Sequence, residues 1–187
     1  MKKTAFIAGG IIVGLFVIVA VAGFFRFNRT NDGDIFFGKM DASDVKNMSL
    51  AIGSELFALE NGKAEKEIAP DSANKNTLVI FGEPVYGDLN DDKKEDAALL
   101  LVNNPGGSGT LYYAVLAING ENGYKATNAI FLGDRIASQT VEIREGHALY
   151  NFTERKPGEP METTSSVGKS FWVFYNKTTG EINEWVR

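Results

Sequence analysis

An acidic segment in the middle of the chain carries oxygen-bearing side chains on alternate residues. Asp88, Asn90, Asp92 and Asp96 fall at positions 1, 3, 5 and 9 of a calcium-type loop. Oxygens with this spacing can converge on one hard cation, and the backbone carbonyl of Lys94 would supply the ligand at position 7. The segment is therefore a candidate Ca²⁺ site, and Ca²⁺ is the only cofactor that the sequence suggests.

Two residues of this segment depart from the calcium-loop pattern. Lys93 stands at position 6, where glycine normally makes the sharp turn, and Leu99 stands at position 12, where an EF-hand has a bidentate glutamate. The segment is therefore no EF-hand, and it is closer to the shorter Asp/Asn-rich loops that join strands. The departures favour the simpler alternative of a solvated acidic turn, in which Lys93 and Lys94 neutralise part of the charge.

Two other loops combine arginine with a carboxylate. Asp134 and Arg135 follow one expected strand, and Arg155 and Glu159 follow another, in a loop stiffened by two prolines. A guanidinium can bind a carboxylate through two parallel hydrogen bonds. The simplest interpretation is an internal ion pair that pins a loop. The alternatives are a cleft that binds a ligand, or a carboxylate pair for acid–base hydrolysis, which would need two well-separated pKa values.

The composition argues against most other catalytic designs. The chain contains no cysteine, which excludes disulfides, a thiolate nucleophile, thiolate-ligated zinc and a lipidated cysteine. Ser108 lies among glycines, but Thr110 stands where a nucleophile elbow needs its second glycine. The single histidine, His147, sits beside an expected hairpin turn. A Ser-His-Asp triad is therefore not indicated.

The N-terminal segment has the composition of a membrane anchor. Residues 5–25 contain no charged or polar side chain. At ~1.5 Å per residue, such a helix can span a hydrocarbon core of ~30 Å, so the lipid bilayer is the first expected partner. We expect residues 1–4 to be a cytoplasmic tail and residues 26–47 a tether. The alternative is a signal peptide cleaved after Ala22, and either interpretation places the remaining chain outside the cytoplasmic membrane.

Two glycines in the apolar segment suggest pairing of membrane helices. Gly10 and Gly14 form a G-x-x-x-G step, and small residues at this spacing allow two helices to approach closely. A homodimer through these glycines is one interpretation. The other is that glycine is simply common in membrane helices.

The distribution of charge along the chain limits the partners that the domain can bind. The net charge is −5, and the first 30 residues carry +4, so the remainder carries −9. An acidic domain without a basic stripe argues against nucleic acid and against surface binding to anionic lipid.

Residues 48–187 have the pattern of a β-rich domain. Turn dipeptides such as Asn61-Gly62, Asn119-Gly120, Asn122-Gly123 and Glu145-Gly146 separate short β-prone runs. Residues 97–102 and 111–118 are apolar at both odd and even positions, so both faces of each strand are apolar. This predicts central strands covered on both faces. We expect a mainly β fold, a curved antiparallel sheet forming a sandwich or partial barrel. The expected strands are 49–59, 64–69, 77–82, 96–103, 110–119, 125–132, 139–145, 147–154, 169–176 and 181–186.

The middle of the chain resembles a family. The segments GDLNDDKKEDAALLLV, NPGGSGTLYYAV, FLGDRI and ERKPGEPM, followed by SVGKS, lie between Phe81 and Gly168, or within a few residues of them. They are similar to uncharacterised bacterial envelope proteins of the LppP/LprE lipoprotein type. The resemblance implies an envelope domain and no particular activity. Family members often have glycine where Lys93 stands, and many have an anchor cysteine, whose place residues 5–25 would take here.

Together these features predict a membrane-anchored binding or structural module on the extracytoplasmic side of a bacterial membrane. Its ligand in the envelope is not indicated by the sequence. The alternative is an envelope hydrolase that uses a carboxylate pair. The single histidine and the absence of cysteine favour the module, because they remove most nucleophile and zinc designs.

Overall fold

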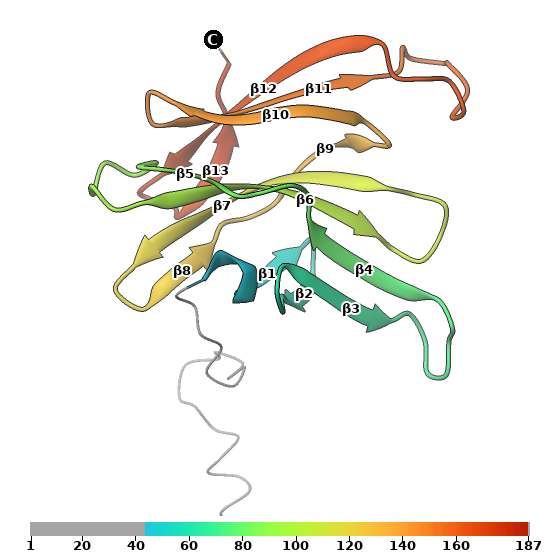
Figure 1. Cartoon of the computed structure of the whole chain (residues 1–187), viewed down its shortest axis with the longest axis horizontal. Coiled ribbons are helices and arrows are strands. Elements are labelled where there is room, and N and C mark those ends of the chain that lie inside the picture. Colours follow the sequence, from blue (N-terminus) through green and yellow to red (C-terminus); the bar gives the residue numbers. More distant parts are fainter. Residues whose placement is uncertain (1–43, 187) are drawn as a thin grey trace, which may run out of the picture. The chain divides into compact units, whose positions relative to one another are not determined.

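The computed structural model describes residues 44–186, which form a mainly β structure without an α-helix in that range (Figure 1). A short 3-10 helix, η1 (Val45–Asn47), precedes the strands. The strands are β1 (Ser49–Ile52), β2 (Glu55–Ala58), β3 (Lys63–Glu67), β4 (Lys75–Ile80), β5 (Val85–Gly87), β6 (Asp96–Asn104), β7 (Leu111–Gly120), β8 (Gly123–Ala126), β9 (Ile130–Asp134), β10 (Ala137–Arg144), β11 (His147–Glu154), β12 (Val167–Asn176) and β13 (Glu181–Glu184).

The strands form three sheets, and every pairing between named strands is antiparallel. The largest sheet has seven strands in the order β3-β4-β6-β7-β8, with β5 also pairing with β6 and β9 with β7. The second sheet has four strands in the order β10-β11-β12-β13, and the third is the β1–β2 hairpin. The prediction of a mainly β fold with a curved antiparallel sheet is confirmed.

Two buried clusters lie on opposite faces of the seven-stranded sheet. On one face, Ala98 and Leu100 of β6 pack in a cluster with Tyr150 and Val173 of the four-stranded sheet. On the other face, Leu99 packs in a cluster with residues of η1 and the β1–β2 hairpin. The eight residues of β6 from 96 to 103 are all buried. The prediction that 97–102 and 111–118 form central strands is therefore confirmed.

Two predicted strands are wrong because local turns interrupt them. The run 49–59 is a hairpin, in which Gly53 adopts a φ of 60° and reverses the chain between β1 and β2. The run 125–132 is split between β8 and β9, which pair with different halves of β7. The Thr127 N–H still donates to the Leu116 carbonyl at 2.9 Å, but the Leu116 N–H donates to the Thr127 hydroxyl at 3.1 Å, so a side chain replaces one of the two backbone bonds at this point.

Two of the predicted turn dipeptides form turns, and one does not. Asn61 and Gly62 have φ values of 53° and 82°, and Glu145 and Gly146 have 51° and 73°, so both predicted turns are confirmed. Asn119-Gly120 is wrong as a turn, because both residues lie in β7 opposite Tyr124 and Gly123. The short strand β5 was not predicted.

The predicted anchor at residues 5–25 and the glycine step at Gly10 and Gly14 lie outside the described residues. Between residues 44 and 186, the structure has no helix long and apolar enough to cross a membrane. Val45 is fully buried in the cluster beneath the seven-stranded sheet. The packed domain therefore extends upstream of Met48, into the last residues of the predicted tether.

Candidate functional site

The acidic loop joins β5 to β6, and its side chains bond to its own backbone. The oxygens of Asp88 accept hydrogen bonds from the backbone N–H groups of Asn90 (3.2 Å), Asp92 (3.2 Å) and Lys93 (2.9 Å). Asn90 accepts from the Asp92 N–H at 2.9 Å, and Asp92 accepts from the Lys94 N–H at 2.8 Å. Lys93 has a φ of 67°, so it adopts the conformation for which the calcium-loop pattern uses glycine.

Asp96 holds the same loop from inside the protein. Its carboxylate is buried and accepts hydrogen bonds from the backbone N–H of Leu89 at 2.9 Å and of Asn119 at 2.8 Å. Burial raises the pKa of Asp96, because the charged form is desolvated, and the nearby charges of Asp92 and Asp88 raise it further. The two N–H donors act in the opposite direction, but they do not outweigh burial.

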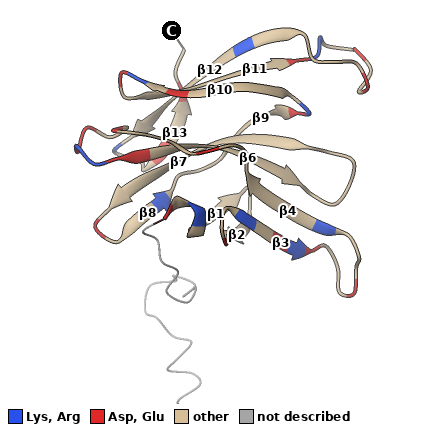
Figure 2. Cartoon of the chain, viewed as in Figure 1, with Lys and Arg blue, Asp and Glu red and all other residues tan. Residues whose placement is uncertain are grey.

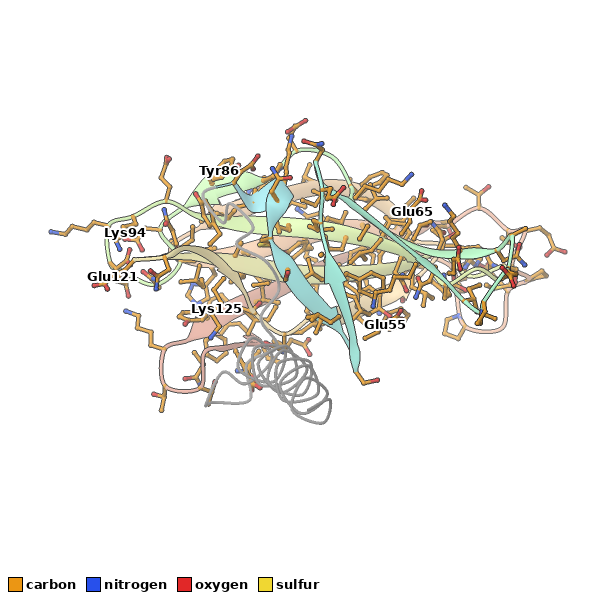
Figure 3. The ribbon with its side chains drawn as sticks, turned by 90° about the horizontal axis from the view of Figure 1, so that it is seen from below. Glu55, Glu65, Tyr86, Lys94, Glu121 and Lys125 are labelled. Carbon is orange, nitrogen blue, oxygen red and sulfur yellow. The ribbon has the colours of Figure 1, made fainter. Side chains whose placement is uncertain are left out.

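In the outer part of the loop, the pKa of Asp88 is shifted in the opposite direction to that of Asp96. Desolvation acts to raise the pKa of Asp88, but the N–H groups of residues 90–93 together lower it below its ordinary value. At the tip, Lys177 pairs with Asp91, with 2.8 Å between Nζ and Oδ2, and Figure 2 shows charges of both signs in this loop. Lys94 lies at the same end of the domain as Glu121 of the β7–β8 turn (Figure 3).

The structure thus places Asp88, Asn90, Asp92 and Lys94 in the connection and Asp96 at the start of β6. The four side chains of this set that carry oxygen already accept hydrogen bonds from backbone N–H groups. Within residues 44–186, no group of three or more histidine, aspartate or glutamate side chains is arranged to hold a metal ion. The Ca²⁺ site remains a prediction.

Asp134, Arg135 and Arg155 meet where three loops join. Arg155 donates from Nη1 to the Arg135 carbonyl at 3.2 Å and from Nη2 to the Asp134 carbonyl at 3.0 Å. Arg135 pairs with Asp134, with 3.2 Å between Nη1 and Oδ2, and also donates to the carbonyl of Ser108. The other Asp134 oxygen accepts from the Thr110 N–H at 2.9 Å. These contacts connect the loop before β7, the end of β9 and the loop after β11.

Glu159 is engaged in a separate turn. Its Oε2 accepts a hydrogen bond from the Lys156 N–H at 2.9 Å, and its own N–H donates to the Lys156 carbonyl at 3.1 Å. Gly158 inside this turn has a φ of 86°. Among the described residues, no hydrogen bond or ion pair joins Glu159 to Arg135 or Arg155. Asp134 and Glu159 therefore each have structural partners, in different loops.

Aromatic residues on the outer face of the four-stranded sheet form a cluster that was not predicted from the sequence. The ring centroids of His147 and Trp185 lie 4.4 Å apart. The ring centroids of Trp172 and Trp185 lie 5.6 Å apart. Leu149 faces Trp172 across β11 and β12 and is only 4% exposed. None of these four residues belongs to either buried cluster. We call them the aromatic face; Figure 1 shows their sheet as the outermost layer of the domain.

A row of polar side chains continues the same surface beside the aromatic face. Asn151 accepts a hydrogen bond from the Ser170 hydroxyl at 2.7 Å and donates to the Thr140 hydroxyl at 2.8 Å. Glu142, which lies opposite Leu149, accepts from Arg144 Nε at 2.7 Å. We call these five residues the polar row. Half-buried aromatic rings therefore lie next to hydrogen-bonding groups on this side of the sheet.

A sequence signal for the aromatic face was present. Every residue from 171 to 175 is apolar, and Phe171, Val173 and Tyr175 pack on the buried cluster between the sheets. Because side chains alternate along a strand, Trp172 must then lie on the opposite face. The position of Trp185 beside Trp172 depends on the β12–β13 pairing, which the sequence does not give.

Comparisons with protein-family models, with curated proteins and with solved structures each found no match to this chain. The resemblance to envelope lipoproteins of the LppP/LprE type therefore remains a prediction.

Proposed function

We propose that this chain is a non-enzymatic module of a bacterial cell envelope. Residues 5–25 anchor it in the cytoplasmic membrane, and the β-rich domain lies on the extracytoplasmic side, where it binds an envelope ligand or partner. The anchor rests on the uncharged run of 21 residues between positions 5 and 25, which is long enough for a membrane helix.

One observation supports a binding or structural function: the charged side chains of the polar loops bond to groups inside the domain. Arg155 and Arg135 hold backbone carbonyls, and Asp134 is held by Arg135 and by a backbone N–H. A general acid and a general base need carboxyl groups that can reach a substrate and that titrate at separated pKa values. The contacts of Asp134 and Glu159 instead support roles in loop structure, which disfavours the hydrolase alternative.

The proposal is tested by topology and membrane retention of the full-length chain. A C-terminal reporter that is active only outside the cytoplasm should be active, and the protein should stay in the membrane fraction after high-salt and alkaline washes, because an apolar spanning helix is not held by charge. An inactive reporter would overturn the extracytoplasmic assignment. A soluble mature chain beginning at Gly23 would show that the segment is a cleaved signal.

A further inference from the structure

An exposed methionine lies in the loop that joins β11 to β12. Met161 is 49% exposed, whereas Met48, the other methionine among residues 44–186, is 2% exposed and lies in the cluster beneath the seven-stranded sheet. Figure 1 shows the β11–β12 loop at one end of the four-stranded sheet. A small polar reagent can therefore reach the thioether of Met161 directly, but it can reach that of Met48 only when the domain opens.

Two turns hold the backbone around Met161. The N–H of Glu159 donates to the Lys156 carbonyl at 3.1 Å, and the N–H of Thr163 donates to the Pro160 carbonyl at 3.0 Å. The second of these turns contains Met161 itself. Backbone hydrogen bonds therefore hold Met161 at a defined place in the loop.

The sulfur of Met161 contacts a guanidinium group that is already fixed in place. Arg155 Nη2 lies 3.7 Å from Met161 Sδ and also donates to the Asp134 carbonyl at 3.0 Å. Arg155 Nη1 donates to the Arg135 carbonyl at 3.2 Å. A thioether sulfur is only a weak acceptor, so its contact with Arg155 contributes little in the reduced protein. A charged donor is thus held next to a sulfur atom that is open to solvent.

The composition and the chemistry of peroxides point to this sulfur. The chain contains no cysteine, so the methionine thioethers are its most readily oxidised sulfur groups. When hydrogen peroxide oxidises a thioether, one peroxide oxygen bonds to sulfur, the O–O bond breaks, and the other oxygen leaves as water with both protons. The sulfur is oxidised to a sulfoxide, and the peroxide is reduced. The product carries a polar oxygen acceptor on the atom that lies beside Arg155.

From these observations, we infer that Met161 is a reversible oxidation site whose sulfoxide oxygen accepts a hydrogen bond from the Arg155 guanidinium. Hydrogen bonds from a charged donor are stronger than those between neutral groups. Oxidation of a buried methionine disrupts the core around it, but Met161 is half exposed and loses little apolar contact. Oxidation therefore stabilises the β11–β12 loop. The inference goes beyond the proposed binding function and does not depend on the side of the membrane on which the domain lies.

The first test measures where peroxide reacts. Full-length protein in a peroxide-free detergent is treated with hydrogen peroxide, and the sulfoxide at each methionine is followed over time by mass spectrometry of peptides. Met161 should be oxidised at least about fivefold faster than Met48, which reacts only from opened states of the domain. A smaller ratio of the two rates would overturn the inference.

The second test measures the sign of the effect on stability. Peroxide-treated wild type should melt about 2 °C or more above the untreated protein, because Arg155 gains an acceptor. Met161→Leu is the matched control: it keeps an apolar side chain that peroxide does not oxidise, so treatment should leave its melting temperature unchanged. An unchanged or lower melting temperature of the treated wild type, or an equal rise in Met161→Leu, would overturn the inference.

A third test identifies the partner of the sulfoxide. The rise on oxidation should be lost in Arg155→Ala and kept in Arg144→Ala, whose arginine side chain is 58% exposed on β10. Methionine sulfoxide reductases with a dithiol should return the wild type to its original melting temperature. The first two tests keep Arg155 in place, so they decide the inference even if Arg155→Ala does not fold. A full rise in Arg155→Ala would show a different partner and overturn the inference.

Discussion

At the scale of single residues, charged side chains of the candidate sites bond mainly to the backbone. Arg155 binds two carbonyls, Asp96 binds two N–H groups, and Asp88 binds three. Sequence composition identified these residues as unusual, but it suggested carboxylate partners and a cation. Backbone partners could not be predicted, because they depend on which strand ends meet in the folded domain.

Replacement of Arg155 tests the role of a loop-pinning arginine. Arg155→Ala should lower the free energy of unfolding by about 1–3 kcal/mol, because the carbonyls of Asp134 and Arg135 lose their donor. Denaturant unfolding of the full-length protein in detergent measures the change. Arg144→Ala is the control: its side chain is 58% exposed, so the effect should stay within about 0.5 kcal/mol. Equal stability of Arg155→Ala and the wild type would indicate an arginine that faces a ligand.

The raised pKa of buried Asp96 predicts a pH dependence. In the folded state this carboxyl keeps its proton to a higher pH than in the unfolded state, so its contribution to stability is greatest below the ordinary pKa of about 3.9 and is lost as the pH rises through the raised value. Asparagine does not titrate. The difference in unfolding free energy, wild type minus Asp96→Asn, should therefore shrink with rising pH. A difference that grows with pH would mean that the pKa is lowered.

At the scale of secondary-structure elements, the sequence predicted the buried strands well and their interruptions poorly. β6 and β7 could be identified because apolar residues at both odd and even positions require other elements to cover both faces of the strand. The β1–β2 hairpin was missed because its turn has no Asn-Gly pair, only Gly53 followed by Ser54. The break after β8 depends on the Thr127 hydroxyl bonding to β7, which is a tertiary contact between strands.

The β10–β11 turn offers a direct test of turn chemistry. Gly146 has a φ of 73°, and a methyl group added there would meet no atom within 4 Å, so backbone conformation alone opposes substitution. Gly146→Ala should cost about 1 kcal/mol of unfolding free energy. Gly107→Ala is the matched control, because Gly107 also has open space and does not have a positive φ in that range. Equal effects of the two substitutions would show that the turn does not require glycine.

The acidic loop tests whether a turn ordered by its own carboxylates also binds a cation. Because its oxygens already accept backbone N–H groups and Lys93 takes the place of glycine, we expect Ca²⁺ affinity no tighter than the extracellular range of ~10⁻⁴–10⁻³ M. Thermal unfolding should not shift at micromolar Ca²⁺, and any rise at millimolar Ca²⁺ should disappear in Asp92→Asn. A shift at micromolar Ca²⁺ would contradict this expectation, and no shift at any concentration would leave a turn without a metal.

At the scale of the whole molecule, the layered arrangement determines which surfaces remain for function. The seven-stranded sheet is covered on one face by the four-stranded sheet and on the other by η1 and the β1–β2 hairpin. The outer face of β10–β13 carries half-buried aromatic rings beside a row of polar side chains. Its residues come from strands that are distant in sequence, such as His147 in β11 and Trp185 after β13. This is why the sequence pointed to polar loops and did not reveal the aromatic face.

We propose that residues 5–25 hold the domain outside the cytoplasmic membrane. Trypsin added to intact wall-free cells tests it on the native chain, because the segment before the described domain contains Arg26, Arg29 and Lys39 as cleavage sites, whereas packed strands resist proteolysis. We predict that trypsin releases the domain into the supernatant as a fragment beginning after Arg29 or Lys39. A full-length chain that stays intact until the membrane is permeabilised would contradict the claim.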